Sequence, residues 1–200
     1  MSIIKAVIFD ADGVVNDGKL MNAEQFGITF ETMQPFFRGP FVECRMGKAD
    51  LRDVLPAHLK EWRWKGTLDE FLDHWFISGN TVNPKVVDTI RMLRTAGIKT
   101  YLGTNQEKHR LEYMRKQMDY QNLFDGIFAS AELKAEKPHR EFFELVHKNL
   151  PYQKEEILFW DDSEKNVEAA RHYGFHTEHF VTDEDFAEKM ARYFPDITFS

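Results

Sequence analysis

The sequence is poor in cysteine, in long apolar runs and in positive charge, and each deficiency excludes a class of protein. It has one cysteine among 200 residues, so a disulfide within the chain is impossible. No stretch approaches the roughly 20 apolar residues that a membrane-spanning helix needs. The 33 acidic residues outnumber the 26 lysines and arginines, and the net charge is −7. This balance argues against nucleic-acid and membrane-surface partners, because both require a basic face.

The first residues do not resemble a signal peptide, because their apolar run is short and Asp10 interrupts it. We therefore expect a cytoplasmic protein. The hydrophobic share of 42% and the charged share of 30% are normal for a globular fold. The length suits one large domain, or a core with a small appendage. The oligomeric state is left open by the sequence.

The most informative stretch is an apolar run, Ile3–Phe9, followed by Asp10, Asp12 and Gly13. The run is short, rich in β-branched residues and does not alternate, which predicts a strand buried on both faces of a parallel sheet. Asp10 then lies at the carboxyl end of a central strand, where α/β sheets bind their ligands. Residues two apart in an extended segment point to the same side, so Asp10 and Asp12 should converge. Such close carboxylates favour a cation between them.

Residues 16–81 contain no strand candidate and have a helical pattern rich in aromatic and charged residues. We expect a helical subdomain over 16–81, inserted into an α/β core made of 1–15 and 82–200. Prolines at 35, 40 and 56 are expected to limit its helices. Thr67 and Glu70 have the spacing of a capping box. The expected helices are Met21–Phe26, Glu31–Phe37, Ala49–Trp62 and Leu68–Ile77.

From Asn83 onward, strand patterns alternate with helix patterns. This alternation predicts a doubly wound parallel sheet with a Rossmann-like topology. The expected strands are Ile98–Leu102, Gly126–Ala129, Ile157–Trp160 and Phe175–Phe180. The expected helices cover residues 84–97, 108–118, 138–150 and 164–173, and a last one begins after Thr182.

Polar residues at later strand ends and helix starts complete the pattern. Thr104 and Asn105 end a strand and open a helix, where hydroxyl, amide and N–H groups suit phosphate. Lys137 precedes another helix and can act as a point charge for phosphate. Asp161 and Asp162 end a buried strand and suit a hard cation. Each signal alone has an ordinary explanation as a helix cap, a solvated lysine or an acidic first turn. Their joint placement at one sheet edge favours a site.

In this order the motifs resemble those of the haloacid dehalogenase superfamily of phosphohydrolases. The helical insert directly after the first motif resembles the small cap of that superfamily. The segments Arg45–Lys48 and Asp73–Trp75 show a weaker similarity to bacterial phosphatases of small sugar phosphates. The four motifs are Phe9–Val14, Leu102–Asn105, Glu136–Pro138 and Trp160–Asn166.

The resemblance implies a mechanism. Asp10 would be the nucleophile, forming an aspartyl-phosphate, and Asp12 the general acid and base. Mg²⁺ would be held by Asp10, by the backbone carbonyl of Asp12 and by Asp162, with Asp161 acting through water. The phosphate would be bound by Thr104, Asn105 and Lys137.

We therefore expect a Mg²⁺-dependent phosphomonoester hydrolase acting on a small phosphorylated metabolite such as a sugar phosphate. The acid at position 12 disfavours dehalogenation, because a halide leaves without a proton. A phosphotransferase or phosphomutase of the same superfamily is one alternative. A phospho-accepting receiver module is another, although receivers place their acidic pair first and lack the insert. The cap residues expected to choose the substrate are Arg38, Arg45, Lys48, Trp62, Trp64 and Trp75.

Overall fold

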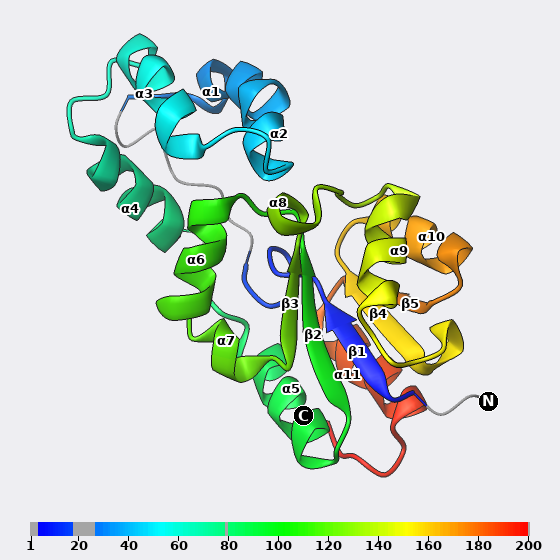
Figure 1. Ribbon diagram of the computed structural model, residues 1–200. Coiled ribbons are helices and arrows are strands. Elements are labelled where there is room, and N and C mark those ends of the chain that lie inside the picture. Colours follow the sequence, from blue (N-terminus) through cyan, green and yellow to red (C-terminus); the bar gives the residue numbers. More distant parts are fainter. Residues whose placement is uncertain (1–3, 18–26, 79, 200) are drawn as a thin grey trace.

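The centre of the protein is a five-stranded parallel sheet with the order β3-β2-β1-β4-β5 (Figure 1). The computed structural model describes residues 4–17, 27–78 and 80–199. The predicted α/β fold class and the parallel pairing of the strands are confirmed. The strands are β1 (Ala6–Phe9), β2 (Lys99–Thr104), β3 (Gly126–Ala129), β4 (Ile157–Asp161) and β5 (His176–His179).

Helices cover both faces of the sheet, as a doubly wound fold requires. On one face lie α5 (Pro84–Thr95), α6 (Lys108–Lys116), α7 (Tyr120–Leu123) and α11 (Asp183–Tyr193). On the other face lie α9 (Arg140–Lys148) and α10 (Glu164–Tyr173). The short helix α8 (Ser130–Leu133) follows β3, and the 3₁₀ turn η2 (Lys154–Glu156) precedes β4.

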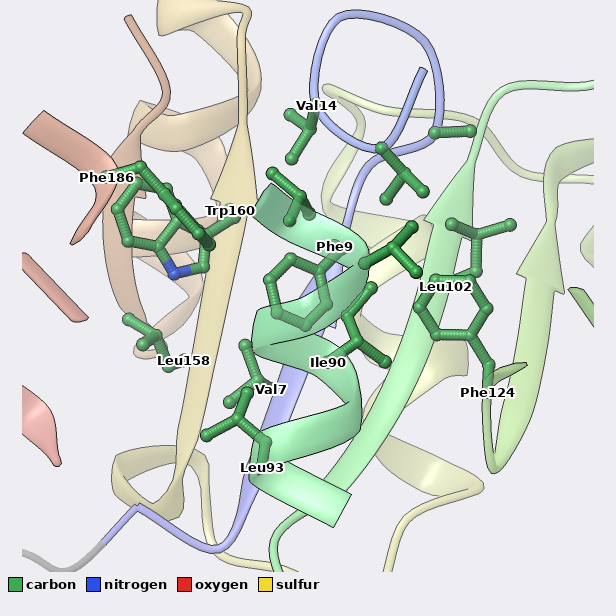
Figure 2. Packing of buried hydrophobic residues seen from close by; sticks show 14 of the residues in the cluster. Val7, Phe9, Val14, Ile90, Leu93, Leu102, Phe124, Leu158, Trp160 and Phe186 are labelled. Carbon is green, nitrogen blue, oxygen red and sulfur yellow. The ribbon is translucent and has the colours of Figure 1, made fainter. Parts of the chain in front are cut away.

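Strand β1 shows why its sequence does not alternate between apolar and polar residues. Val7 and Phe9 belong to the hydrophobic cluster under α5 and α11, whereas Ala6 and Ile8 belong to the cluster under α9 and α10. Figure 2 shows Phe9 lying among side chains of α5, β2 and β4. Because both faces are buried, both sets of side chains must be apolar.

The register of the strands brings the polar strand ends together. Phe9 is paired with Leu102 on one side and with Trp160 on the other. Asp10 and Asp161 are therefore the next residues on adjacent strands, and the Asp10 N–H donates to the Trp160 carbonyl at 2.9 Å. The predicted site edge is thus fixed by strand pairing.

The helices and strands that the structure describes between β1 and α5 are all helices, and they lie apart from the sheet (Figure 1). They have an aromatic cluster of their own, which includes Phe36, Trp62 and Phe71. This cluster supports the division at residues 15/16 and 81/82, which stays a prediction. The expected helix 21–26 lies outside the described residues. The helices are α1 (Phe30–Arg38), α2 (Pro40–Arg45), α3 (Leu51–Glu61) and α4 (Leu68–Ser78).

The expectation that prolines limit these helices was wrong for two of three. Pro40 begins α2, but Pro35 lies inside α1 and Pro56 inside α3. An interior proline costs about 3 kcal/mol, and burial of one leucine returns roughly 1.5–3 kcal/mol. One face of α3 offsets that cost with three buried leucines, Leu51, Leu55 and Leu59.

Residues 137–139 form a turn, and α9 begins only at Arg140 instead of at 138. This turn carries Lys137 toward the carboxyl ends of the strands. The short helices α2, α7 and α8 were not predicted, because four to six residues give too little periodicity to detect. No helix within the described residues is long and apolar enough to cross a membrane.

Candidate active site

The site is built around the buried ammonium group of Lys137. Its Nζ lies 2.9 Å from Oδ1 of Asp10 and 2.6 Å from Oδ2 of Asp161. All three side chains are buried. Asp10 follows β1 and Asp161 ends β4, so strand pairing fixes both carboxylates.

The second oxygen of Asp161 is also occupied. Oδ1 accepts hydrogen bonds from the Ser163 N–H and from Asn166 Nδ2, each at 2.9 Å. Asn166 belongs to the fourth motif, but no role was predicted for it. Since both oxygens of Asp161 have protein donors, this carboxylate is a structural support of the site.

Asp162 is exposed and completes a group of three carboxylates with Asp10 and Asp161. One oxygen from each lies within 4.8 Å of the other two. Gly13 permits this approach: its φ is +90°, and a Cβ there would lie 2.2 Å from Oδ2 of Asp162. A glycine is therefore required both by the backbone and by the neighbouring acid.

The electrostatics of this group favour a bound cation. Burial raises the pKa of Asp10 well above its usual value, and Asp161 adds to the rise although Lys137 opposes it. Burial and the charge of Asp161 likewise raise the pKa of Asp162. Burial alone would lower the pKa of Lys137, but Asp10 and Asp161 outweigh it and raise that pKa. Three carboxylates around one ammonium leave excess negative charge, and carboxylate oxygens are the ligands that Mg²⁺ prefers.

The loop after β2 positions Lys137 from the other side. Thr104 is buried at the strand end. Asn105 donates from Nδ2 to the Lys137 carbonyl at 2.9 Å and accepts the Lys137 N–H at Oδ1, also at 2.9 Å. Both polar atoms of the Asn105 side chain are thus engaged with the backbone of Lys137.

Asp12 lies outside the carboxylate group and is held by amide donors. Its Oδ1 accepts from Asn16 Nδ2 at 2.7 Å, and its Oδ2 accepts from Gln106 Nε2 at 2.5 Å. Nη2 of Arg110 lies 3.9 Å from Oδ1. None of these three neighbours was predicted from the sequence. Gln106 directly follows the second motif and could have been suspected, whereas Asn16 and Arg110 had no signal beyond being polar.

The cap residues expected to choose the substrate divide into two groups. The three tryptophans pack in the aromatic cluster of the cap, where Trp62 is only 6% exposed. Arg45 instead reaches the core, and its Nε donates to Oε2 of Glu136 at 2.6 Å, one residue before Lys137. The remaining two, Arg38 and Lys48, are exposed.

Comparison with known proteins identifies the family. The family model of haloacid dehalogenase-like hydrolases matches residues 4–174. The chain belongs to this family. The resemblance in the four motifs is therefore confirmed, and so is the expectation of a hydrolase enzyme.

Several curated relatives of the chain are named as phosphatases. The chain is 27% identical over 179 residues to a phosphorylated carbohydrates phosphatase of Thermotoga maritima, covering 86% of this chain and 82% of that protein. It is 24% identical over 154 residues to a phosphoglycolate phosphatase of Salmonella typhimurium. That match covers 77% of this chain and 61% of the relative, so the chain spans less than two thirds of that relative's length.

Solved structures of this family share the fold. A HAD family enzyme of Bacteroides thetaiotaomicron, crystallised with magnesium and inorganic phosphate, has a TM-score of 0.78 at 20% identity. The alignment covers 93% of this chain and 98% of that one. A HAD-like hydrolase of Porphyromonas gingivalis has a TM-score of 0.80 at 20% identity, covering 96% and 98%.

Proposed function

We propose that this haloacid dehalogenase-like hydrolase cleaves phosphomonoesters, with Asp10 as the nucleophile and Mg²⁺ as cofactor. The observation that carries the proposal is the buried contact of Lys137 with Asp10 and Asp161, beside the exposed Asp162. A positive charge next to a carboxylate lets it approach a phosphate dianion.

The reaction has two steps. First, a carboxylate oxygen of Asp10 forms a bond to phosphorus while the ester P–O bond breaks. The leaving oxygen takes a proton from Asp12. Second, a water attacks the aspartyl-phosphate, gives a proton to Asp12 and releases Asp10. Phosphate and alcohol are the products, and both aspartates return to their starting state.

Asp10, Asp162 and the backbone carbonyl of Asp12 would hold Mg²⁺, with Asp161 acting through water. Both side-chain oxygens of Asp161 already accept hydrogen bonds, from Lys137, Ser163 and Asn166. This supports an indirect role for Asp161 at the metal. When bound, Mg²⁺ offsets the negative charge that gathers around the phosphate. Lys137 and the N–H groups of the Thr104–Asn105 loop would bind the phosphoryl oxygens.

The proposed substrate is a small phosphorylated metabolite such as a sugar phosphate. The printed names of the relatives support this class, since one acts on phosphorylated carbohydrates and the other on phosphoglycolate. A phosphotransferase or phosphomutase would share the first step and differ in the acceptor. Release of free phosphate, rather than transfer to a second sugar, is the outcome that favours hydrolysis.

The test is steady-state phosphate release from sugar phosphates, phosphoglycolate and nucleotides, with Mg²⁺ and after exhaustive chelation. We expect turnover that chelation abolishes and Mg²⁺ restores. Asp10→Asn should abolish it, whereas Asp196→Asn, on the exposed C-terminal segment, should not. Unchanged turnover without metal, or an active Asp10→Asn variant, would contradict the proposal.

A further inference from the structure

Both carboxylate oxygens of Asp12 accept hydrogen bonds from side chains for which the sequence predicted no role. We infer that Asn16 and Gln106 are positioning residues that aim Asp12 at the scissile oxygen, an inference that rests on the proposed function. The Asp12 side chain is 41% exposed, so packing alone does not fix its rotamer. Donors at both oxygens do.

Asn16 is anchored on three sides. It is 1% exposed, its N–H donates to the Ala11 carbonyl at 2.9 Å, and its own carbonyl accepts the Gly13 N–H at 2.8 Å. Its side-chain Oδ1 accepts from the hydroxyl group of Tyr120, which is buried. Because Oδ1 receives this hydrogen bond, Nδ2 is directed to Asp12. A reversed amide would place an oxygen against the carboxylate.

Gln106 holds the other oxygen of Asp12 from the loop after β2. It is 8% exposed, and its carbonyl accepts the N–H of Ala131 in α8 at 3.3 Å. Its neighbour Asn105 holds the backbone of Lys137. The side chains of Asn105 and Gln106 therefore fix Lys137 and Asp12 relative to each other.

The chemistry explains why orientation is valuable here. A general acid must lie within hydrogen-bond reach of the leaving oxygen, and small displacements of reacting groups cost large factors in rate. Neutral amides fix the direction of the carboxyl without adding a charge. Arg110 does bring a charge, but its 3.9 Å separation from Asp12 is beyond hydrogen-bond distance.

The test compares Gln106→Leu and Tyr120→Phe with the unmodified enzyme on an alkyl phosphate and on an aryl phosphate with a good leaving group. An alkoxide needs the proton from Asp12 more than a phenolate does. For Gln106→Leu we expect kcat to fall about tenfold or more on the alkyl phosphate, part of the roughly 100- to 10,000-fold that a general acid supplies. KM and the first step of the aryl reaction, measured as the initial burst of phenolate, should change little, whereas breakdown of the shared aspartyl-phosphate should slow for both substrates. Tyr120→Phe should show the same selectivity with a smaller loss, because it frees Asn16 only.

A double-mutant cycle separates positioning from general damage. In an Asp12→Ala background, Gln106→Leu should cause no further loss, because its effect passes through Asp12. The same fold-loss in that background, or equal losses in the first step on both substrates, would overturn the inference. Tyr120→Phe keeps the ring and provides the same comparison if Gln106→Leu does not fold. An enzyme without phosphatase turnover, or an active Asp10→Asn variant, would instead overturn the proposed function.

Discussion

At the scale of single residues, the site depends on one lysine. Lys137 is 3% exposed and contacts two buried carboxylates. Removing one member of such a buried group leaves the others uncompensated, which commonly costs about 3–5 kcal/mol. Lys137 should therefore affect both stability and catalysis.

The first prediction contrasts two lysines. Lys137→Ala should lower kcat/KM about 100- to 1,000-fold, the usual cost of removing one electrostatic stabiliser of a transition state. Lys165→Ala, on the exposed face of α10, should leave kcat/KM nearly unchanged. Phosphate-release kinetics measure both, and circular dichroism checks that the variants fold. Comparable losses from both variants would show that the third motif is misassigned.

At the scale of elements, the turn after β1 depends on a glycine beside an acid. Gly13 and Gly97 both have positive φ, +90° and +83°. A Cβ on Gly13 would collide with Asp162, whereas a Cβ on Gly97 would meet nothing within 4 Å. A comparison of alanine substitutions at the two positions therefore separates the effect of backbone strain from the effect of displacing Asp162.

The second prediction uses this matched pair. Gly13→Ala and Gly97→Ala should each lose roughly 1–2 kcal/mol of stability from the positive φ. Only Gly13→Ala should also lose activity, by about 100-fold, because it displaces Asp162. Chemical denaturation and Mg²⁺ titration of activity measure the two effects. Equal activity in the two variants would remove Asp162 from the metal site.

A second element-scale feature is the contact between cap helix α3 and core helix α6. Asp50 accepts the Arg52 N–H at 2.9 Å as the N-cap of α3. It also contacts Nε2 of His109 at 2.6 Å and Nζ of Lys108 at 3.0 Å. Burial would raise the pKa of Asp50, but these hydrogen bonds outweigh it and lower that pKa.

The third prediction follows from the two roles of Asp50. Asp50→Ala should destabilise the protein about 1 kcal/mol more than Asp50→Asn, because asparagine keeps the N-cap. A lowered folded-state pKa means that the charge stabilises the protein above the unfolded pKa of about 3.9 and ceases to do so as the pH falls further. The stability gap between wild type and Asp50→Asn, measured by urea unfolding, should shrink as the pH falls from about 5 to about 3. A gap independent of pH would contradict the ion-pair account.

At the scale of the whole molecule, the sequence predicted the parallel sheet and the residues at its ligand-binding edge. An apolar run that does not alternate predicts a buried strand, and the polar residues that end the strand can be identified directly in the sequence. Asp10 and Asp161 were placed in this way, and pairing of β1 with β4 brings them together. The catalytic roles of these residues remain predictions.

Contacts between distant segments could not be predicted. Gln106 contacts Asp12, and Tyr120 contacts Asn16, only once the loop after β2 and helix α7 have packed beside the turn after β1. The tryptophans were candidates for substrate contact because spacing alone does not separate a cap core from a binding surface. Trp75 packs against Phe37 and Phe41 in the cap.

The fourth prediction concerns the cap as a substrate selector. Arg45 links α2 of the cap to Glu136, next to Lys137. Arg45→Ala should change the ranking of substrates by about tenfold between sugar phosphates and an aryl phosphate reference, the scale expected when one charged contact is lost. Lys60→Ala, on the exposed face of α3, should preserve the ranking. If Arg45→Ala scales every substrate equally, Arg45 takes no part in selection.

The central claim is that the phosphoryl group passes through Asp10, and trapping it there is the most direct test. Asp12→Ala keeps the nucleophile but lacks the base for the attacking water, so turnover of an aryl phosphate should accumulate aspartyl-phosphate. The reaction would be quenched in acid and the phosphorylated peptide mapped by mass spectrometry. We predict a phosphoryl group on Asp10 that is absent from the Asp10→Asn, Asp12→Ala double variant. A phosphoryl group on Thr104, Ser163 or a histidine, with none on Asp10, would contradict the account.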